Sequence, residues 1–159
     1  MTTTRIAVIG DIHHGRDTPT KRGSTALPLL GRFVEEVNAA SVDAVIELGD
    51  RISDESPARD RVLEEEVAEC FNKLSVPHHH VSGNHDVALL SLADNEAILV
   101  RPSGSRALII GEVRCVFWQP DVTLTRERGL GLSPGDLDDL VRMLAADDRP
   151  TLLLSHVPL

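Results

Sequence analysis

The stretch Val81-Ser82-Gly83-Asn84-His85-Asp86 follows an apolar run that begins at Leu74, so it stands where a strand ends. Gly83 lets the backbone turn sharply without a Cβ clash. The residues after it present an amide, an imidazole and a carboxylate, which can bind a metal ion or carry a proton. Glycine, asparagine and aspartate are also common in turns. The stretch alone is therefore compatible with an ordinary turn or with a functional site. The residues at the other strand ends decide between these two interpretations.

The composition favours a single soluble domain over residues 1–159, because 42% of the residues are hydrophobic and 26% are charged. The net charge of −9 argues against nucleic acid as a partner. A small phosphorylated substrate is compatible with this net charge, because a bound cation reverses the local field.

Cys70 and Cys115 are predicted to be buried hydrophobes rather than ligands. With no signal-peptide or membrane-spanning run, we expect a cytoplasmic protein.

The run Arg5–Gly10 is short, apolar and β-branched, which predicts a buried parallel strand. Asp11 and His13 follow it directly. Alternation along an extended chain would place these two side chains on one side, where both can reach a single ion, and His14 on the other. We therefore expect His14 to lie on the substrate side of any site.

The polar loop 16–24 carries Arg16, Lys21 and Arg22. Basic clusters in loops are commonly solvated. Because this loop follows the candidate site directly, contact with a substrate phosphate is the alternative, and Arg16 is the residue that we assign to it.

Two more strands end in ligand-type residues. Asp50 follows the predicted strand 42–48, beside a glycine, and His156 follows the predicted strand 151–154. Strands that alternate with helices predict a largely parallel sheet, whose functional crevice lies at the carboxyl ends of the strands. The candidate site residues share that placement: Asp11, His13, Asp50, Asn84, His85 and His156.

The helices are predicted from apolar residues at spacings of three and four, up to Ala40 for the first helix and around 63–74 for the second. Ser133, followed by a proline, predicts the start of a third helix. The acidic block 64–66 is interpreted as a solvated helix face. Short strands are expected at 97–100, 106–110 and 113–118, the last two forming a hairpin. His78-His79-His80 are interpreted as strand residues, since adjacent positions face opposite sides.

Carboxylate, imidazole and amide donors without thiolates suit Mn, Fe or Zn. A carboxylate such as Asp50 can bridge two ions, which would activate water and neutralise phosphate oxygens. A nucleotide-binding α/β domain is disfavoured, because the sequence contains no glycine-rich phosphate loop.

The order Asp11-x-His13, Gly49-Asp50, Gly83-Asn84-His85-Asp86 and Ser155-His156 resembles the calcineurin-like metallophosphoesterase family over essentially the whole chain. The resemblance implies an α/β fold, an αββα sandwich of two mixed sheets flanked by helices, with two divalent metal ions. It implies one metal at Asp11, His13 and bridging Asp50, and a second metal at Asp50, Asn84 and His156. It further implies that His85 protonates the leaving alkoxide and that Asp86 holds the His85 ring.

One departure from the family pattern concerns the final Gly-His-x-His motif, which does not occur in this sequence. We therefore expect a C-terminally truncated domain in which each metal lacks one protein ligand. A complementing C-terminal segment or a second copy of the chain would then supply it. The predicted function is hydrolysis of a phosphomonoester or phosphodiester, with a nucleotide-type substrate possible in principle. The alternative is a non-catalytic metal-binding or interaction subunit with the same fold.

Overall fold

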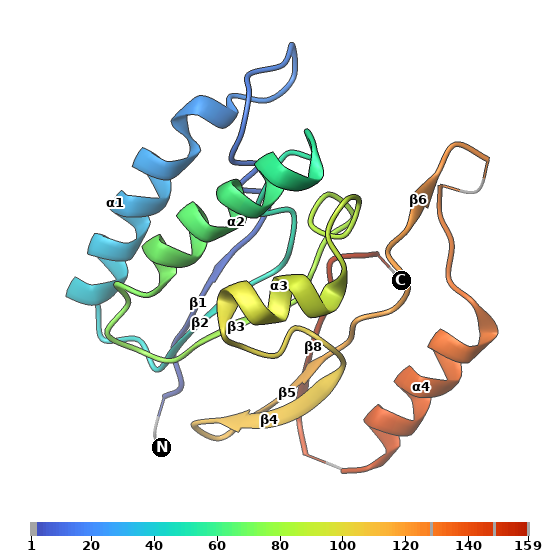
Figure 1. Ribbon diagram of the computed structural model, residues 1–159. Helices are drawn as coiled ribbons and strands as arrows, with labels where there is room; N and C mark the ends of the chain where they lie inside the picture. Colours follow the sequence, from blue (N-terminus) through green and yellow to red (C-terminus); the bar gives the residue numbers. More distant parts are fainter. Residues whose placement is uncertain (1–2, 128, 148, 159) are drawn as a thin grey trace.

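The computed structural model describes residues 3–127, 129–147 and 149–158. Figure 1 shows its helices and strands in sequence order. The strands are β1 (Ile6–Ile9), β2 (Ala44–Glu47), β3 (His78–His80), β4 (Arg106–Ile110), β5 (Val113–Phe117), β6 (Leu124–Thr125), β7 (Gly129–Leu130) and β8 (Thr151–Leu154). The helices are α1 (Ala26–Ala39), α2 (Pro57–Phe71), α3 (Leu92–Leu99), α4 (Pro134–Ala145) and a short 3₁₀ turn at Gly23–Thr25.

The first sheet has the order β1-β2-β3, and all of its described pairings are parallel. Parallel neighbours need a crossover, and the helices α1 and α2 supply the two crossovers. Both helices cover the same face of this sheet, where they lie side by side (Figure 1). All three strands therefore end at one edge of the sheet, as the sequence predicts.

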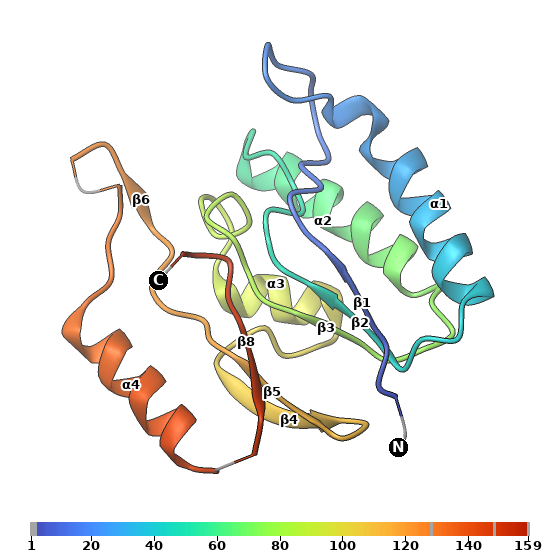
Figure 2. The ribbon, with the colours of Figure 1, turned by 180° about the vertical axis from the view of Figure 1, so that it is seen from behind.

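The second sheet has the order β4-β5-β8 and is mixed. The β4 and β5 strands form the expected antiparallel hairpin, with Gly111 at φ +57° in its turn. The strand β8 runs parallel to β5 after a crossover through α4. Figure 2 shows α4 on the far side of this sheet from α1 and α2. His156 thus reaches the site from the second sheet.

The two sheets pack face to face because the side chains of β2 alternate between two cores. Val45 packs under α1 and α2, whereas Ala44 and Ile46 face Phe117 and Leu154 of the second sheet. A third apolar cluster joins the second sheet to α4 around Trp118. The predicted αββα sandwich is confirmed, with one difference: the first sheet is parallel rather than mixed over the described residues.

Two local predictions are wrong. Residues 97–99 belong to α3 rather than to a strand, because Ser91 and Asp94 form a capping box that starts this helix. Glu64, assigned to a solvated helix face, is fully buried, because α2 turns it toward Arg51.

The predicted helix start at Ser133 is confirmed by its own capping box. None of the helices in the described part of the chain is long and apolar enough to cross a membrane.

Candidate metal centre

The predicted ligands adopt a backbone conformation that is unusual for their residue types. Asp11, His13 and Asp50 have φ values of +53°, +49° and +57°. Only one other non-glycine residue of the described chain, Val100, has a positive φ. Such left-handed residues cost free energy and cluster where function requires them. The predicted convergence of Asp11 and His13 is thus produced by left-handed turns and not by strand alternation.

Asp50 lies at the centre of the site, with a different group of side chains at each carboxylate oxygen. Its Oδ2 lies 3.7 Å from Nε2 of His13, which in turn lies 3.6 Å from Oδ1 of Asp11. Its Oδ1 lies 3.5 Å from Nε2 of His156, which lies 3.3 Å from Oδ1 of Asn84. The carboxylate of Asp50 is almost completely buried, whereas the side chain of Asp11 is 74% exposed.

These two groups of donors fit the metal ions that their chemistry implies. Metal bonds of about 2.0–2.2 Å bring neighbouring nitrogen and oxygen ligands to roughly 3 Å from one another. The observed separations around Asp50 are slightly longer and involve no thiolate. His156 also directs Nδ1 at the carbonyl oxygen of Leu48, at 2.9 Å, which leaves Nε2 free as a ligand. His13, Asp50 and His85 by themselves form a cluster compact enough to hold an ion.

Gly83 brings the loop after β3 against the loop after β2. A Cβ atom at this position would overlap the backbone nitrogen and the carboxylate of Asp50. The expected reason for this glycine was a sharp turn, but Gly83 is not among the described residues with positive φ. The close approach of Asp50 is what requires a glycine here.

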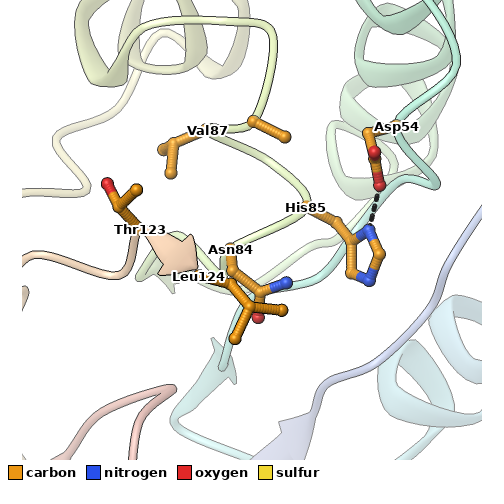
Figure 3. A pocket seen from close by; sticks show the side chains of 7 residues that line it. Asp54, Asn84, His85, Val87, Thr123 and Leu124 are labelled. Atoms are coloured by element: carbon orange, nitrogen blue, oxygen red, sulfur yellow. Dashed lines mark hydrogen bonds and ion pairs between the residues drawn. The ribbon is translucent and has the colours of Figure 1, made fainter. Parts of the chain in front are cut away.

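His85 reaches the edge of the site, where its Nε2 lies 3.9 Å from Oδ2 of Asp50. Its Nδ1 makes a short hydrogen bond with the carboxylate of Asp54, as Figure 3 shows. The expected partner of this ring was Asp86, and that expectation is wrong. Asp54 fixes the tautomer, so that Nε2 is the nitrogen that faces the site.

The carboxylate of Asp86 is fully buried behind the site and accepts hydrogen bonds from backbone amides. It accepts from Asp50 at 2.9 Å, from Arg51 at 2.8 Å and from Gly83 at 2.8 Å. These amides belong to the loops after β2 and β3. Asp86 therefore holds together the two loops that carry Asp50, Asn84 and His85.

A buried ionic network supports Asp86 from behind. The Arg51 guanidinium, which is fully buried, lies 3.3 Å from Asp86 and donates to Glu47 at 2.7 Å and to Glu64 at 2.6 Å. Burial alone would lower the pKa of Arg51, but the surrounding carboxylates raise it well above its usual range. Burial raises the pKa of Glu47 and of Glu64 to about 7. Loss of hydration, together with the nearby charge of Asp86, thus outweighs the attraction of the Arg51 cation for these two carboxylates.

Lys21 is a site residue that the sequence analysis placed only in a basic loop. Its Nζ lies 2.8 Å from Nε2 of His85 and 3.2 Å from Nδ1 of His13. Burial lowers the pKa of His13, and the Lys21 ammonium lowers it further against the opposing effect of Asp50. A lowered pKa keeps His13 neutral, which is the form that binds a metal.

The two predicted substrate-binding residues, His14 and Arg16, have described contacts outside the group of donors around Asp50. The imidazole of His14 is buried and pairs with Glu66 of α2, 2.8 Å away, so it does not face the donors around Asp50. Arg16 is exposed, and its backbone amide donates to Glu55 at 2.7 Å. Neither side chain makes a described contact with the site.

The histidines of β3 take no part in the site, as predicted. His80 is fully buried and pairs with Glu47 at 3.2 Å and with His78 at 2.8 Å. Burial lowers the pKa of His78 to about 3 and that of His80 well below its usual value. These neutral rings pack against Phe71 in the core.

A pocket of about 280 Å³ opens beside His85 and Asn84. Val87, Ala88 and Leu124 give it an apolar side, and Thr123 and Asp54 complete its lining. Figure 3 shows that the β3 loop and the segment leading into β6 contribute the facing walls. A substrate bound at the donors around Asp50 could extend its organic group into this pocket.

Comparisons with known proteins identify the fold and the family of the chain. The chain is similar in fold to the crystal structure of a dimetal phosphatase from Danio rerio, with a TM-score of 0.78 and 17% sequence identity. The match covers 98% of this chain and 70% of that chain. No curated protein matches the sequence. The family model of the calcineurin-like phosphoesterases matches residues 4–159. Since that match spans the strand-end ligands of both sheets, the chain belongs to the calcineurin-like phosphoesterases, a family of metal-dependent hydrolases of phosphoester bonds.

Proposed function

We propose that this chain hydrolyses phosphoesters with two divalent metal ions placed on either side of Asp50. The observation that carries the proposal is the arrangement at the Asp50 carboxylate. One of its oxygens faces His13 and the other faces His156. When bound, such ions activate water and neutralise the phosphoryl oxygens in an in-line displacement.

The ligand assignment follows the two groups of donors. Asp11, His13 and Asp50 would hold one ion, and Asp50, Asn84 and His156 would hold the other. The exposed Asp11 lies on the open side of the site, whereas the buried Asp50 lies between the groups. The nitrogen and oxygen donors suit Mn, Fe or Zn equally well.

His85 is the proposed general acid. The Asp54 carboxylate holds Nδ1, so the acid proton is carried by Nε2 on the side that faces Asp50. From there His85 can protonate the oxygen of the leaving group. The adjoining pocket, with Val87, Ala88 and Leu124, then accommodates the leaving alcohol. Both phosphomonoesters and phosphodiesters, including nucleotides, remain candidate substrates in this proposal.

The competing hypothesis is a non-catalytic, metal-binding subunit of the same fold. The observation in its favour is that, within the described residues, the ligand assignment gives each ion three protein donors. We propose that water, a second copy of the chain or a further protein segment completes each coordination sphere.

A cytoplasmic location also belongs to this proposal, since Cys70 and Cys115 are both free thiols.

The deciding experiment compares wild type with His85→Ala after loading with Mn²⁺. Hydrolysis of p-nitrophenyl phosphate and of bis-p-nitrophenyl phosphate is followed with EDTA-treated protein as the blank, and bound metal is measured by mass spectrometry. We expect unchanged metal content and a loss of kcat of about 10²–10⁴-fold. His79→Ala, a change in the core strand β3, is the matched control and should keep its turnover.

Two results would count against the proposal. Unchanged turnover in His85→Ala would remove the general-acid role. Wild-type protein that binds two ions per chain but hydrolyses neither ester would favour the non-catalytic hypothesis.

A further inference from the structure

The Lys21 ammonium points into the metal centre, where the described residues give it no anionic partner. Its described side-chain contacts are with the imidazoles of His85 and His13, at 2.8 and 3.2 Å. Among the described carboxylates, none forms an ion pair with Lys21, although Asp50 lies close to both rings. A half-buried cation whose described contacts are imidazole nitrogens rather than carboxylates is set up to bind an anion from outside the protein.

The loop that carries Lys21 is held in place by its backbone. The amide of Lys21 donates to Oγ1 of Thr18 at 3.1 Å, and the amide of Thr18 donates to the carbonyl of Lys21 at 2.9 Å. Asp17 and Arg22 pair across the same turn. The turn therefore fixes the backbone of Lys21, and the contacts with His13 and His85 place its ammonium at the site.

This turn also docks directly on the loop that carries the metal ligands. A Cβ atom on Gly23 would come within 2.6 Å of the carbonyl oxygen of Gly15 and within 2.8 Å of that of His13. Such contacts are shorter than real Cβ atoms tolerate, so the close approach depends on glycine. The Lys21 turn and the Asp11–His13 loop thus form one packed unit.

We propose that Lys21 contacts the substrate, binds a non-bridging phosphoryl oxygen and thereby favours phosphomonoesters over phosphodiesters. This inference rests on the proposed function and specifies its substrate class. A monoester carries close to two negative charges at neutral pH, because its second pKa is about 6, whereas a diester carries one. A fixed cation attracts the dianion more strongly than the monoanion.

The test uses the metal-loaded full chain as wild type, Lys21→Met and Lys21→Arg. Values of kcat/KM are measured for p-nitrophenyl phosphate and for bis-p-nitrophenyl phosphate. A charged hydrogen bond is worth about 10–100-fold, so Lys21→Met should lower kcat/KM for the monoester by that factor and much less for the diester. Lys21→Arg should restore part of the preference. Lys73→Met, the same change at an exposed lysine that follows α2, is the matched control and should leave both values unchanged.

Binding of inorganic phosphate by calorimetry gives a second measurement that needs no turnover. Lys21→Met should weaken phosphate binding by about tenfold or more at equal metal content. An equal loss for both esters would overturn the proposal, since it would reduce Lys21 to a structural role. Unchanged phosphate binding would overturn it as well, even if the wild type hydrolyses neither ester. A wild type that hydrolyses neither ester would reject the hydrolase function. If its phosphate binding still depended on Lys21, the anion site itself would stand.

Discussion

The carboxylate of Asp86 accepts a hydrogen bond of 2.9 Å from the backbone amide of Asp50, although the two residues are 36 positions apart in the chain. The same oxygen accepts the amide of Gly83 at 2.8 Å. One buried side chain thus sets the distance between the loop after β2 and the loop after β3. The metal donors Asp50 and Asn84 are held by Asp86, which itself faces away from the site.

Replacing Asp86 with asparagine should weaken metal binding by about 10–100-fold. Asparagine keeps only one acceptor oxygen, so its N–H₂ group must face either the amides of Asp50 and Gly83 or the amide of Arg51, and those donors lose their acceptor. Titration with Mn²⁺ by calorimetry measures this change. Asp138→Asn, an exposed change on α4, is the control. Equal affinities in Asp86→Asn and wild type would show that the loops keep their spacing without this carboxylate.

Gly83→Ala should abolish metal binding and destabilise the fold by about 1–3 kcal/mol, because the added methyl group overlaps Asp50. Gly31→Ala is the matched control, since no atom lies within 4 Å of a Cβ at this position of α1. That substitution should raise helix stability by up to about 1 kcal/mol. Urea unfolding and metal titration of both variants provide the comparison. Native affinity in Gly83→Ala would mean that the loops can separate without loss of the site.

Asp54→Asn should lower kcat by about 10²-fold while metal content and KM stay close to wild type. Asp54 orients the ring of His85 but lies outside the donor groups around Asp50. An asparagine can present its N–H₂ group to Nδ1, and it lacks the negative charge that accepts the Nδ1 proton and stabilises the doubly protonated ring that acts as the acid. Steady-state kinetics and metal analysis separate the two effects. A loss of metal, with kcat per bound metal unchanged, would contradict the orienting role.

The Arg51 network should make folding stability depend on pH through Glu64. Burial raises the pKa of Glu47 and Glu64 to about 7 from the usual 4.5. A carboxyl whose folded-state pKa is raised contributes stability that is complete below its unfolded-state pKa and is lost as pH rises through the folded-state value. The window for this loss therefore runs from about pH 4.5 to about pH 7.

Glu64→Gln tests this dependence, because glutamine does not titrate. The free energy of unfolding of wild type relative to this variant should fall as pH rises through the window and stay level above it. Urea unfolding at about pH 5 and about pH 8 measures the difference. Glu65→Gln, an exposed change on the same helix, controls for the loss of charge on α2. A difference between wild type and Glu64→Gln that does not change with pH would refute the prediction.

The local pattern of the sequence predicted the strands β1, β2, β4, β5 and β8, and placed the candidate metal ligands just beyond strand ends. Periodicity is a consequence of covalent geometry, so the apolar runs before Asp11, Asp50 and His156 predicted strands from neighbouring residues alone. Parallel pairing then brings the strand ends to one edge, which is why the donors could be expected to converge.

Which side chains pair with one another at the site was decided only by the tertiary structure. His85 pairs with Asp54, 31 residues away, and not with the adjacent Asp86, because the loops fold so that Asp86 points back toward Arg51. Lys21 reaches His85 across 64 residues through a turn that no periodicity describes. Contacts of this kind depend on how separate loops pack on one another.

The difference between local sequence pattern and long-range contacts also explains the burial of Glu64. Its neighbours in the sequence are acidic, and this local pattern is typical of a solvated helix face. The fully buried Arg51 reverses that preference by offering a charged partner inside the protein. Sequence periodicity therefore determined the elements and the strand ends of this protein, whereas long-range packing and charge pairing decided which side chains support the site and which enter it.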